Sequence, residues 1–316
     1  MCILITGATG LIGNAIVQKC RDNDVNVNFL TTRKHKIKDK DGLKGFYWNP
    51  RKGEIDLACF EGVTAVINLA GSSISQRWTK ANKKKILNSR LDSLRTLRSA
   101  LEKIDTSEIT SFVSASAIGI YPHSFDHYYT EEEKDVDDSF LGEVVSKWEQ
   151  EIQLFTKFPF SVAALRVGLV LSMDGGALPA MVRPIKAYVG AAFGSGEQWQ
   201  SWIHIEDLAR QFIFIVDHSL EGTFNGVAPN PVTNNRLVKE VAEVVNRPLI
   251  LPNIPQGLMR LVLGEMSFIL FASQRVSSKK IEEEGFDFYY KNICSALENV
   301  IQSEEKKSDI YKKEFV

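Results

Sequence analysis

A short apolar strand, a glycine-rich turn and a helical pattern follow one another at the start of the chain. The strand is predicted over residues 2–6 and the helix over residues 10–22, and the turn reads Gly7-Ala8-Thr9-Gly10-Leu11-Ile12-Gly13. In such a unit the first glycine permits a tight turn, the second lets the backbone approach a pyrophosphate, and the third lets the helix pack on the sheet. The N–H groups and positive dipole at the start of the helix attract phosphates. A turn that only packs tightly is the alternative, but its place between strand and helix favours dinucleotide binding.

Strand and helix patterns alternate along the first half of the chain. Short β-branched runs separated by longer amphipathic stretches are typical of a parallel sheet covered by helices on both faces. After Ser172, glycines and prolines divide the chain into shorter elements. We therefore expect the α/β class, with a Rossmann-type doubly wound parallel sheet over residues 1–172 and a smaller C-terminal substrate lobe over residues 173–316, some elements of which return to the first domain. The predicted strands are 2–6, 25–31, 65–69, 109–114 and 162–167, and the predicted helices are 10–22, 79–104, 140–157, 205–218, 233–245 and 292–306.

Composition argues against several classes of function. A formal net charge of -1 and a pI of about 6.6 give no general attraction to nucleic acid or anionic lipid. The lysine-rich stretches 34–44 and 80–85 carry no nucleic-acid-reading motif. No apolar run approaches the roughly 20 residues of a membrane span, and no signal-peptide pattern is present. The four cysteines, Cys2, Cys20, Cys59 and Cys294, lack the paired spacing of a disulfide framework or a metal site. We expect a cytoplasmic protein with no metal, no nucleic-acid partner and no membrane contact, and a solvated tail over residues 304–313.

The end of the second predicted strand bears on which dinucleotide is bound. Sites that select NAD place a carboxylate there for the adenosine ribose, whereas the extra phosphate of NADP calls for a cation. This strand ends without an acidic residue and continues into Arg33 and Lys34. The Arg33 guanidinium can form a fork on a phosphate, and Lys34 adds charge. A basic surface loop is the alternative, but the missing acid favours NADP(H).

Several motifs resemble one protein superfamily. The spacing of the glycines as GxxGxxG resembles the short-chain dehydrogenase/reductase superfamily. Later segments are similar to its atypical extended branch, the sugar-nucleotide epimerase-like proteins of the NAD-dependent epimerase/dehydratase superfamily. These segments are Asn68-Leu69-Ala70-Gly71, Arg77-Trp78-Thr79 leading to Ser89-Arg90, Ser114-Ala115-Ser116-Ala117-Ile118-Gly119-Ile120-Tyr121, Leu165-Arg166-Val167-Gly168, Gly194-Ser195-Gly196, Ser201-Trp202-Ile203-His204 and Gln274-Arg275-Val276.

The resemblance implies NADP(H) in the N-terminal domain and a C-terminal lobe that closes a substrate pocket over the nicotinamide. Superfamily analogy alone also suggests a homodimer. The residues expected at the cofactor are Gly7, Thr9, Gly10, Leu11, Ile12, Gly13, Arg33, Lys34, Asn68, Leu69, Ala70, Gly71, Arg90 and Lys147.

The resemblance also implies a catalytic tyrosine and lysine four residues apart on one helix. There the lysine grips the nicotinamide ribose and lowers the pKa of the tyrosine from about 10, so that the phenol exchanges a proton as hydride moves. Lys147 matches the lysine, but Glu143 stands at the tyrosine position. A surface i,i+4 ion pair, worth only about 0.2–0.5 kcal/mol, is the alternative interpretation of these two residues.

Two further residues are candidates for the chemistry. Ser116 corresponds to the superfamily serine, although a shift of one residue would place Ala117 there and Ser114 is another option. Tyr121 could supply a phenol from a different backbone position. Its alternative role is an aromatic side chain that fills the pocket wall.

The substrate side of the site differs from that of nucleotide-sugar enzymes. Where those enzymes carry an arginine for a diphosphate, Gln200 stands here, and a neutral amide cannot replace a charged fork. Trp202 and His204 are candidates for the pocket lining, with a structural role for His204 as the alternative. The sequence thus predicts an oxidoreductase or epimerase that uses NADP(H) on an unidentified small carbonyl, polyol or sugar-derived substrate. A catalytically impaired NADP(H)-sensing or scaffold protein is the alternative.

Overall fold

The computed structural model describes residues 1–40 and 42–314, with side chains up to residue 303, so the solvated tail predicted over residues 304–313 lies outside the described side chains. The described chain divides into two compact units. Unit 1 comprises Met1–Pro122, Lys134–Val167 and Ala209–Phe224, and unit 2 comprises His123–Glu133, Gly168–Leu208 and Asn225–Val316. The division predicted at residue 172 lies close to the step from Val167 to Gly168.

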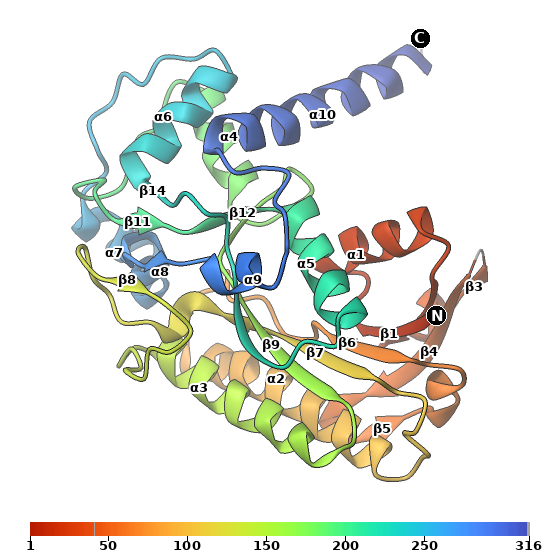
Figure 1. Cartoon of the computed structure of the whole chain (residues 1–316). Helices are drawn as coiled ribbons and strands as arrows, with labels where there is room; N and C mark the ends of the chain where they lie inside the picture. The colour runs from red at the N-terminus through yellow and green to blue at the C-terminus, as the bar shows by residue number, and fades with distance from the viewer. Residues whose placement is uncertain (41, 315–316) are drawn as a thin grey trace. The chain divides into compact units, whose positions relative to one another are not determined.

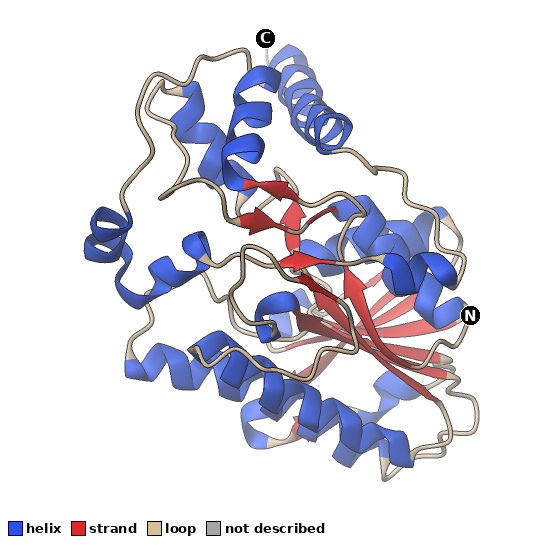
Figure 2. Ribbon diagram, turned by 60° about the vertical axis from the view of Figure 1, so that its left-hand side comes forward, coloured by secondary structure: helices blue, strands red, loops and turns tan. Residues whose placement is uncertain are grey.

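A nine-stranded sheet runs through unit 1, with the order β13-β9-β7-β6-β1-β2-β4-β3 and with β5 paired to β4, within the described residues. Six neighbouring strands, from β9 to β4, are parallel, and β3 and β5 are antiparallel to β4. Figure 2 shows these strands twisting relative to one another. The strands are β1 (Cys2–Thr6), β2 (Asn26–Thr31), β3 (Asp39–Lys40), β4 (Leu43–Asn49), β5 (Glu54–Ile55), β6 (Ala65–Asn68), β7 (Ser111–Ala117), β9 (Ser161–Val167) and β13 (Gly222–Gly226).

Helices cover both faces of this sheet. On one face, α2 (Lys80–Leu101) and α3 (Phe140–Gln153) lie side by side, and on the other lie α1 (Leu11–Asp22) and the part of α5 (Ile205–Asp217) that belongs to unit 1 (Figure 1). Central strands covered on both faces must be apolar throughout, and Ile3, Leu4 and Ile5 of β1 are fully buried. The α/β class and the Rossmann type predicted from the sequence are confirmed.

Polar side chains set where the long helices of unit 1 begin. The hydroxyl of Thr79 accepts the N–H of Asn82 before α2, and the hydroxyl of Ser139 accepts the N–H of Gly142 before α3. Each hydroxyl pairs a backbone donor that the first turn leaves unsatisfied. Short 3-10 turns complete the unit: η1 (Lys34–Lys36), η2 (Pro50–Lys52), η3 (Leu57–Phe60), η4 (Ile118–Ile120) and η5 (Leu154–Lys157).

Unit 2 is built from short strand pairs and helices around its own apolar core, which includes Leu171, Leu178, Trp202, Leu237 and Leu297. Strand β10 pairs with β12, β11 with β14, and β15 with β8. None of the helices in the described part of the chain combines the length and apolar character of a membrane span. The elements are β8 (Tyr128–Tyr129), β10 (Leu169–Leu171), β11 (Trp199–Gln200), β12 (Trp202–His204), β14 (Val232–Thr233), β15 (Arg275–Val276), α4 (Leu178–Lys186), α6 (Asn234–Val244), α7 (Gln256–Leu263), η6 (Gly264–Ser267), α8 (Phe268–Phe271), α9 (Lys279–Glu283) and α10 (Ile293–Glu314).

Candidate functional site

The glycine-rich turn between β1 and α1 has the geometry of a phosphate cradle. Gly7 has a φ of 70°, a left-handed conformation that favours glycine, and its carbonyl accepts the N–H of Gly10 at 2.9 Å. A Cβ on Gly13 would lie 2.3 Å from the Gly7 carbonyl oxygen, so only glycine allows this contact. Within the described helix α1, no side chain caps the N-terminus and the first turn carries no acidic residue. The N–H groups of that turn are therefore suited to donate hydrogen bonds to an anion.

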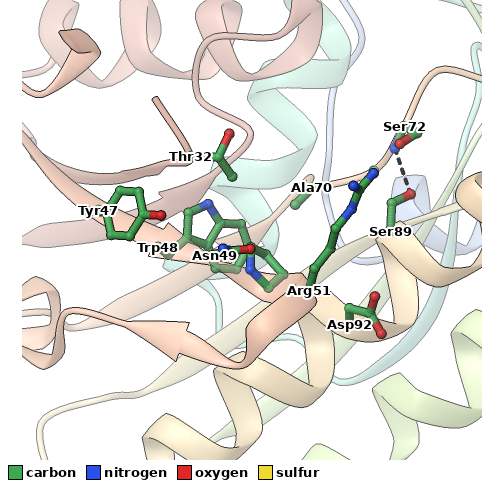
Figure 3. Close-up of a pocket in the computed structure, with 11 residues that line it drawn as sticks. Thr32, Tyr47, Trp48, Asn49, Arg51, Ala70, Ser72, Ser89 and Asp92 are labelled. Atoms are coloured by element: carbon green, nitrogen blue, oxygen red, sulfur yellow. Dashed lines mark hydrogen bonds between the residues drawn. The ribbon is translucent and has the colours of Figure 1, made fainter. Parts of the chain in front are cut away.

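A pocket of about 460 Å³ lies in unit 1 (Figure 3), and the N–H of its lining residue Ala70 donates to the hydroxyl of Thr6, which precedes the glycine-rich turn. Four chain segments surround it: the end of β2, the end of β4 with η2, the segment after β6, and α2. In a doubly wound sheet, ligands bind at the carboxyl ends of the parallel strands, which is where three of these segments lie. The lining residues are Thr32, Tyr47, Trp48, Asn49, Pro50, Arg51, Ala70, Gly71, Ser72, Ser89 and Asp92.

One cation lines this pocket, and two more follow its lining residue Thr32 in the chain. Arg51 lines the pocket, and Arg33 follows the lining residue Thr32. Lys34 lies with its Nζ 5.1 Å from the ring centroid of Tyr47, another lining residue. In the described part of the chain, neither the Arg33 nor the Arg51 guanidinium has a hydrogen-bond or ion-pair partner. Both are therefore free to bind an anionic ligand.

The part of this pocket that β4 and η2 provide was not predicted from the sequence. Residues 34–44 were expected to be a basic stretch, and no strand was expected over residues 43–49. A third parallel strand is nevertheless required between the second strand and the sheet edge in this fold, and the apolar run Phe46-Tyr47-Trp48 was the signal for it. The pocket also contains the Asp92 carboxylate, which comes from α2 rather than from the end of β2.

Asn68 is the centre of a buried hydrogen-bond network beneath the pocket. Its Oδ1 accepts the Thr6 hydroxyl at 2.7 Å, and its Nδ2 donates to the Ser114 hydroxyl at 3.0 Å. The Thr6 hydroxyl in turn accepts the N–H groups of Leu69 and Ala70 at 3.0 and 3.1 Å. The network fixes the backbone that presents Ala70 and Gly71 to the pocket. A direct contact between Asn68 or Leu69 and a cofactor stays a prediction.

Arg90 packs directly behind the pocket wall. Its Nη1 donates to the carbonyl oxygens of Ser72 at 3.1 Å and Ile86 at 2.9 Å, and its guanidinium lies 4.8 Å from the ring of Trp148. Burial lowers the pKa of Arg90 to about 10. A Cβ on Gly71 would approach the Arg90 Cζ to 3.2 Å. In this structure Arg90 holds the segment that lines the pocket, and its contact with a cofactor stays a prediction.

The two residues at the superfamily tyrosine and lysine positions pair with each other. The Lys147 Nζ lies 2.6 Å from the Glu143 Oε1, and the two side chains are 46% and 55% exposed. This is the surface i,i+4 pair that was the alternative interpretation of these two residues. Paired in this way, the Glu143 carboxylate accepts a hydrogen bond from the Lys147 ammonium.

Ser116 and Tyr121 share a buried network in unit 1. The Ser116 hydroxyl donates to the Glu149 Oε1 at 2.6 Å, and Arg166 donates to both oxygens of the same carboxylate at 2.8 Å. The Arg166 Nη1 also donates to the Tyr121 hydroxyl at 2.9 Å, and Tyr121 is fully buried. Burial alone would lower the pKa of Arg166, but the hydrogen bonds and charge of Glu149 raise it above its ordinary value. Tyr121 thus has the packing role that the sequence left open, and a catalytic role for either residue stays a prediction.

The two residues predicted for the substrate pocket lie inside unit 2. Trp202 is fully buried, and its indole N–H donates to the carbonyl of Asn230 at 2.9 Å. His204 is 3% exposed and stacks on Tyr290 with ring centroids 3.8 Å apart. Both contacts fit structural roles, and contact of either side chain with substrate stays a prediction. No group of three His, Cys, Asp or Glu side chains within the described residues is placed to hold a metal ion.

One protein family matches most of this chain. The model of the NAD dependent epimerase/dehydratase family matches residues 3–226, which is more than half of the chain. The chain belongs to this family. A second model, of a domain of unknown function (DUF1731), matches residues 254–300 in unit 2.

Relatives of this epimerase/dehydratase chain match it over nearly its full length. An epimerase family protein of Staphylococcus haemolyticus is 37% identical over 301 residues, which cover 95% of this chain and 99% of that protein. The solved structure of the human epimerase family protein SDR39U1 with NADPH is 25% identical, has a TM-score of 0.82, and covers 96% of this chain and 99% of that chain. A nucleoside-diphosphate sugar epimerase from Corynebacterium glutamicum is 28% identical, with a TM-score of 0.75 over 95% of this chain and 58% of that chain. The resemblance to the atypical extended branch is confirmed.

Proposed function

We propose that this epimerase/dehydratase family member binds NADP(H), with the pyrophosphate on the glycine-rich turn and the adenosine end in the pocket of unit 1. The observation that carries the proposal is the Arg51 guanidinium, which lines the pocket and has no partner in the described chain. The equally unpartnered Arg33 follows the lining residue Thr32, and the Lys34 Nζ lies by the ring of the lining residue Tyr47. A phosphate of charge near −2 would satisfy both groups, since arginine forms its strongest hydrogen bonds with such oxyanions. The similar human protein solved with NADPH supports the same cofactor.

The proposed activity is that of an oxidoreductase or epimerase acting on a small carbonyl, polyol or sugar-derived substrate. A bound nicotinamide supplies hydride transfer. Lys147 would grip the nicotinamide ribose, and it would have to leave Glu143 to do so. Breaking this ion pair costs little free energy, because an exposed i,i+4 pair contributes only about 0.2–0.5 kcal/mol.

The proposal includes a cytoplasmic homodimer. The four cysteines are free thiols, which fits a reducing compartment.

A second function, NADP(H) sensing without turnover, is favoured by one specific observation. The position of the superfamily tyrosine holds the exposed Glu143, while Tyr121 is fully buried and bonded to Arg166. In this arrangement neither residue presents a phenol to a substrate. A sensor would keep the cofactor site described above and lack redox chemistry.

Calorimetry with NADPH and NADH tests the cofactor part of the proposal. We expect NADPH to bind more tightly than NADH, and Arg33→Ala to weaken NADPH binding by about tenfold or more while leaving NADH binding unchanged, because a lost charged hydrogen bond costs about 1.5–3 kcal/mol. His35→Ala is the control, since His35 is exposed in η1, the 3-10 turn that begins after Arg33. Equal affinities for the two cofactors, or an unchanged preference in Arg33→Ala, would overturn the choice of NADP(H).

Turnover separates the enzyme from the sensor. The protein is mixed with NADPH or NADP and with panels of carbonyls, polyols and nucleotide sugars, and the absorbance of the reduced nicotinamide and the stereochemistry of the sugars are followed. The enzyme proposal expects turnover that Lys147→Ala abolishes. Tight NADPH binding with no change in any panel would favour the sensor.

A further inference from the structure

Arg275 in unit 2 lies between two aromatic rings. It is on β15, whose partner β8 places Tyr128 opposite it. The guanidinium carbon is 5.1 Å from the ring centroid of Tyr128 and 4.5 Å from that of Trp199. The Trp199 indole N–H donates to the carbonyl of Phe125 at 2.8 Å, which fixes that ring. The cation is therefore held between two ring faces.

The hydrogen-bonding capacity of this guanidinium is unused. Within the described residues, Arg275 has no side-chain hydrogen bond and no ion pair, and its Nε is buried without a partner. Ring faces attract the positive charge, but they do not accept the in-plane N–H donors of the fork. A buried donor without a partner is costly, so a ligand oxygen that accepts the Nε–H would stabilise this arrangement. By contrast, Arg236 in the same unit is an exposed arginine that pairs with Glu240.

The backbone around Arg275 is rigid, as a binding site requires. The buried Ser201 hydroxyl donates to the carbonyl of Gln274 at 2.8 Å and accepts the N–H of Val276 at 2.9 Å, so it bonds the residues on both sides of Arg275. Tyr128 is 38% exposed, which leaves this side of the arrangement open to solvent. Arg275 is itself only partly buried, so a ligand can approach its guanidinium from this side.

We propose that Arg275, held by Tyr128 and Trp199, binds an oxyanion of the substrate, a phosphate or a carboxylate group. The planar fork of arginine matches two oxygens of such a group, and the flanking rings prevent the fork from turning away. Gln200, next to Trp199, carries no charge for this purpose, and Arg275 on β15 provides the cation. The inference deepens the proposed function and rests on it, because it assigns an anionic substrate to the same protein.

Fluorine NMR on protein that contains 5-fluorotryptophan tests both sites separately. Trp199 reports on Arg275, whereas Trp48 lines the nucleotide pocket, and Trp199→Phe and Trp48→Phe assign the two resonances. Protein saturated with NADPH is titrated with inorganic phosphate, pyrophosphate and acetate at low ionic strength. We expect at least one of these anions to shift the Trp199 resonance, and the comparison of phosphates with acetate identifies the preferred group.

Variants of Arg275 decide the result. Arg275→Gln should weaken the binding of that anion by about tenfold or more, Arg275→Lys should weaken it less because the charge remains without the fork, and Arg236→Gln should leave it unchanged. If Arg275→Gln does not fold, Arg275→Lys serves in its place. The proposal is overturned if no anion moves Trp199 or if these Arg275 variants bind as the natural protein does. If NADPH does not shift the Trp48 resonance, that result counts against the proposed cofactor and not against the role of Arg275.

Discussion

At the residue scale, His204 shows how burial determines charge. Its Nδ1 accepts the N–H of Glu206 at 3.1 Å, and its Nε2 lies 3.2 Å from the Asn299 Oδ1, so the neutral ring satisfies both contacts. Burial lowers the pKa of His204 to about 4 from an ordinary value of 6.5, although the charge of Asp207 and the bond to Asn299 oppose the shift. The folded protein therefore keeps this histidine neutral through a pH range in which the unfolded chain protonates it.

This difference makes stability depend on pH. The contribution of His204 is fully present above about pH 6.5 and is lost as the pH falls toward 4, by up to about 3 kcal/mol, because the unfolded state binds the proton more tightly. Chemical denaturation at about pH 7 and about pH 5 measures the loss. We expect His204→Gln to reduce the loss and His35→Gln, at an exposed site, to leave it unchanged. Equal losses in all three proteins would contradict the assignment.

The Glu143 and Lys147 pair gives a second prediction at this scale. Both side chains are about half exposed, so Glu143→Ala should change the free energy of unfolding by less than about 0.5 kcal/mol. If Lys147 grips the cofactor ribose, Lys147→Ala should weaken NADPH binding, whereas Glu143→Ala should leave it unchanged or strengthen it by releasing the lysine. Denaturation and calorimetry on both variants provide the measurement. Identical effects of the two substitutions on binding would show that only the ion pair matters.

At the element scale, the turn between β1 and α1 depends on a close approach that only glycine permits. A Cβ on Gly13 would lie 2.3 Å from the Gly7 carbonyl oxygen and 2.6 Å from the Ala8 Cα, and backbone atoms cannot yield as a flexible side chain does. Gly13→Ala should destabilise the protein by about 1–3 kcal/mol or more and weaken NADPH binding. The control is Gly257→Ala in α7, where an added Cβ meets nothing within 4 Å. This control should be neutral or stabilising by up to about 1 kcal/mol. A Gly13→Ala protein as stable as the control would refute the geometry.

The elements that the sequence predicted well are those with a strong local pattern. Strands β1, β6 and β9 and helices α1, α5 and α6 lie within a few residues of their predicted bounds because their apolar periodicity is uninterrupted. Strand β4 was not predicted because Gly45 and flanking lysines weaken its apolar strand pattern. The pocket residues Tyr47 and Arg51, which lie in and just after this strand, were therefore not predicted either. Their contribution depends on strand order in the sheet, which local periodicity does not encode.

At the scale of the whole molecule, the chain passes repeatedly between its two units. Residues 123–133 belong to unit 2, and residues 209–224 return to unit 1. The sequence anticipated that some later elements return, but not which ones, since membership of a unit depends on contacts between residues distant in the chain. The contacts of Arg275 with Tyr128 and Trp199 could not be predicted from the sequence for the same reason, because the three residues lie on three different strands.

Cofactor binding should be visible as a change in the stability of the entire chain. A ligand that binds only the folded state adds about 2.7 kcal/mol at a concentration 100 times its dissociation constant. NADPH should therefore raise the unfolding midpoint more than NADH at equal concentration, and Arg33→Ala should remove most of the difference because the cation at the end of β2 is lost. The shift is expected for an enzyme and for a sensor alike, since both need the folded pocket. Equal shifts from the two cofactors would mean that the guanidinium groups of Arg33 and Arg51 do not bind the extra phosphate of NADPH. Both groups would then need another anionic ligand.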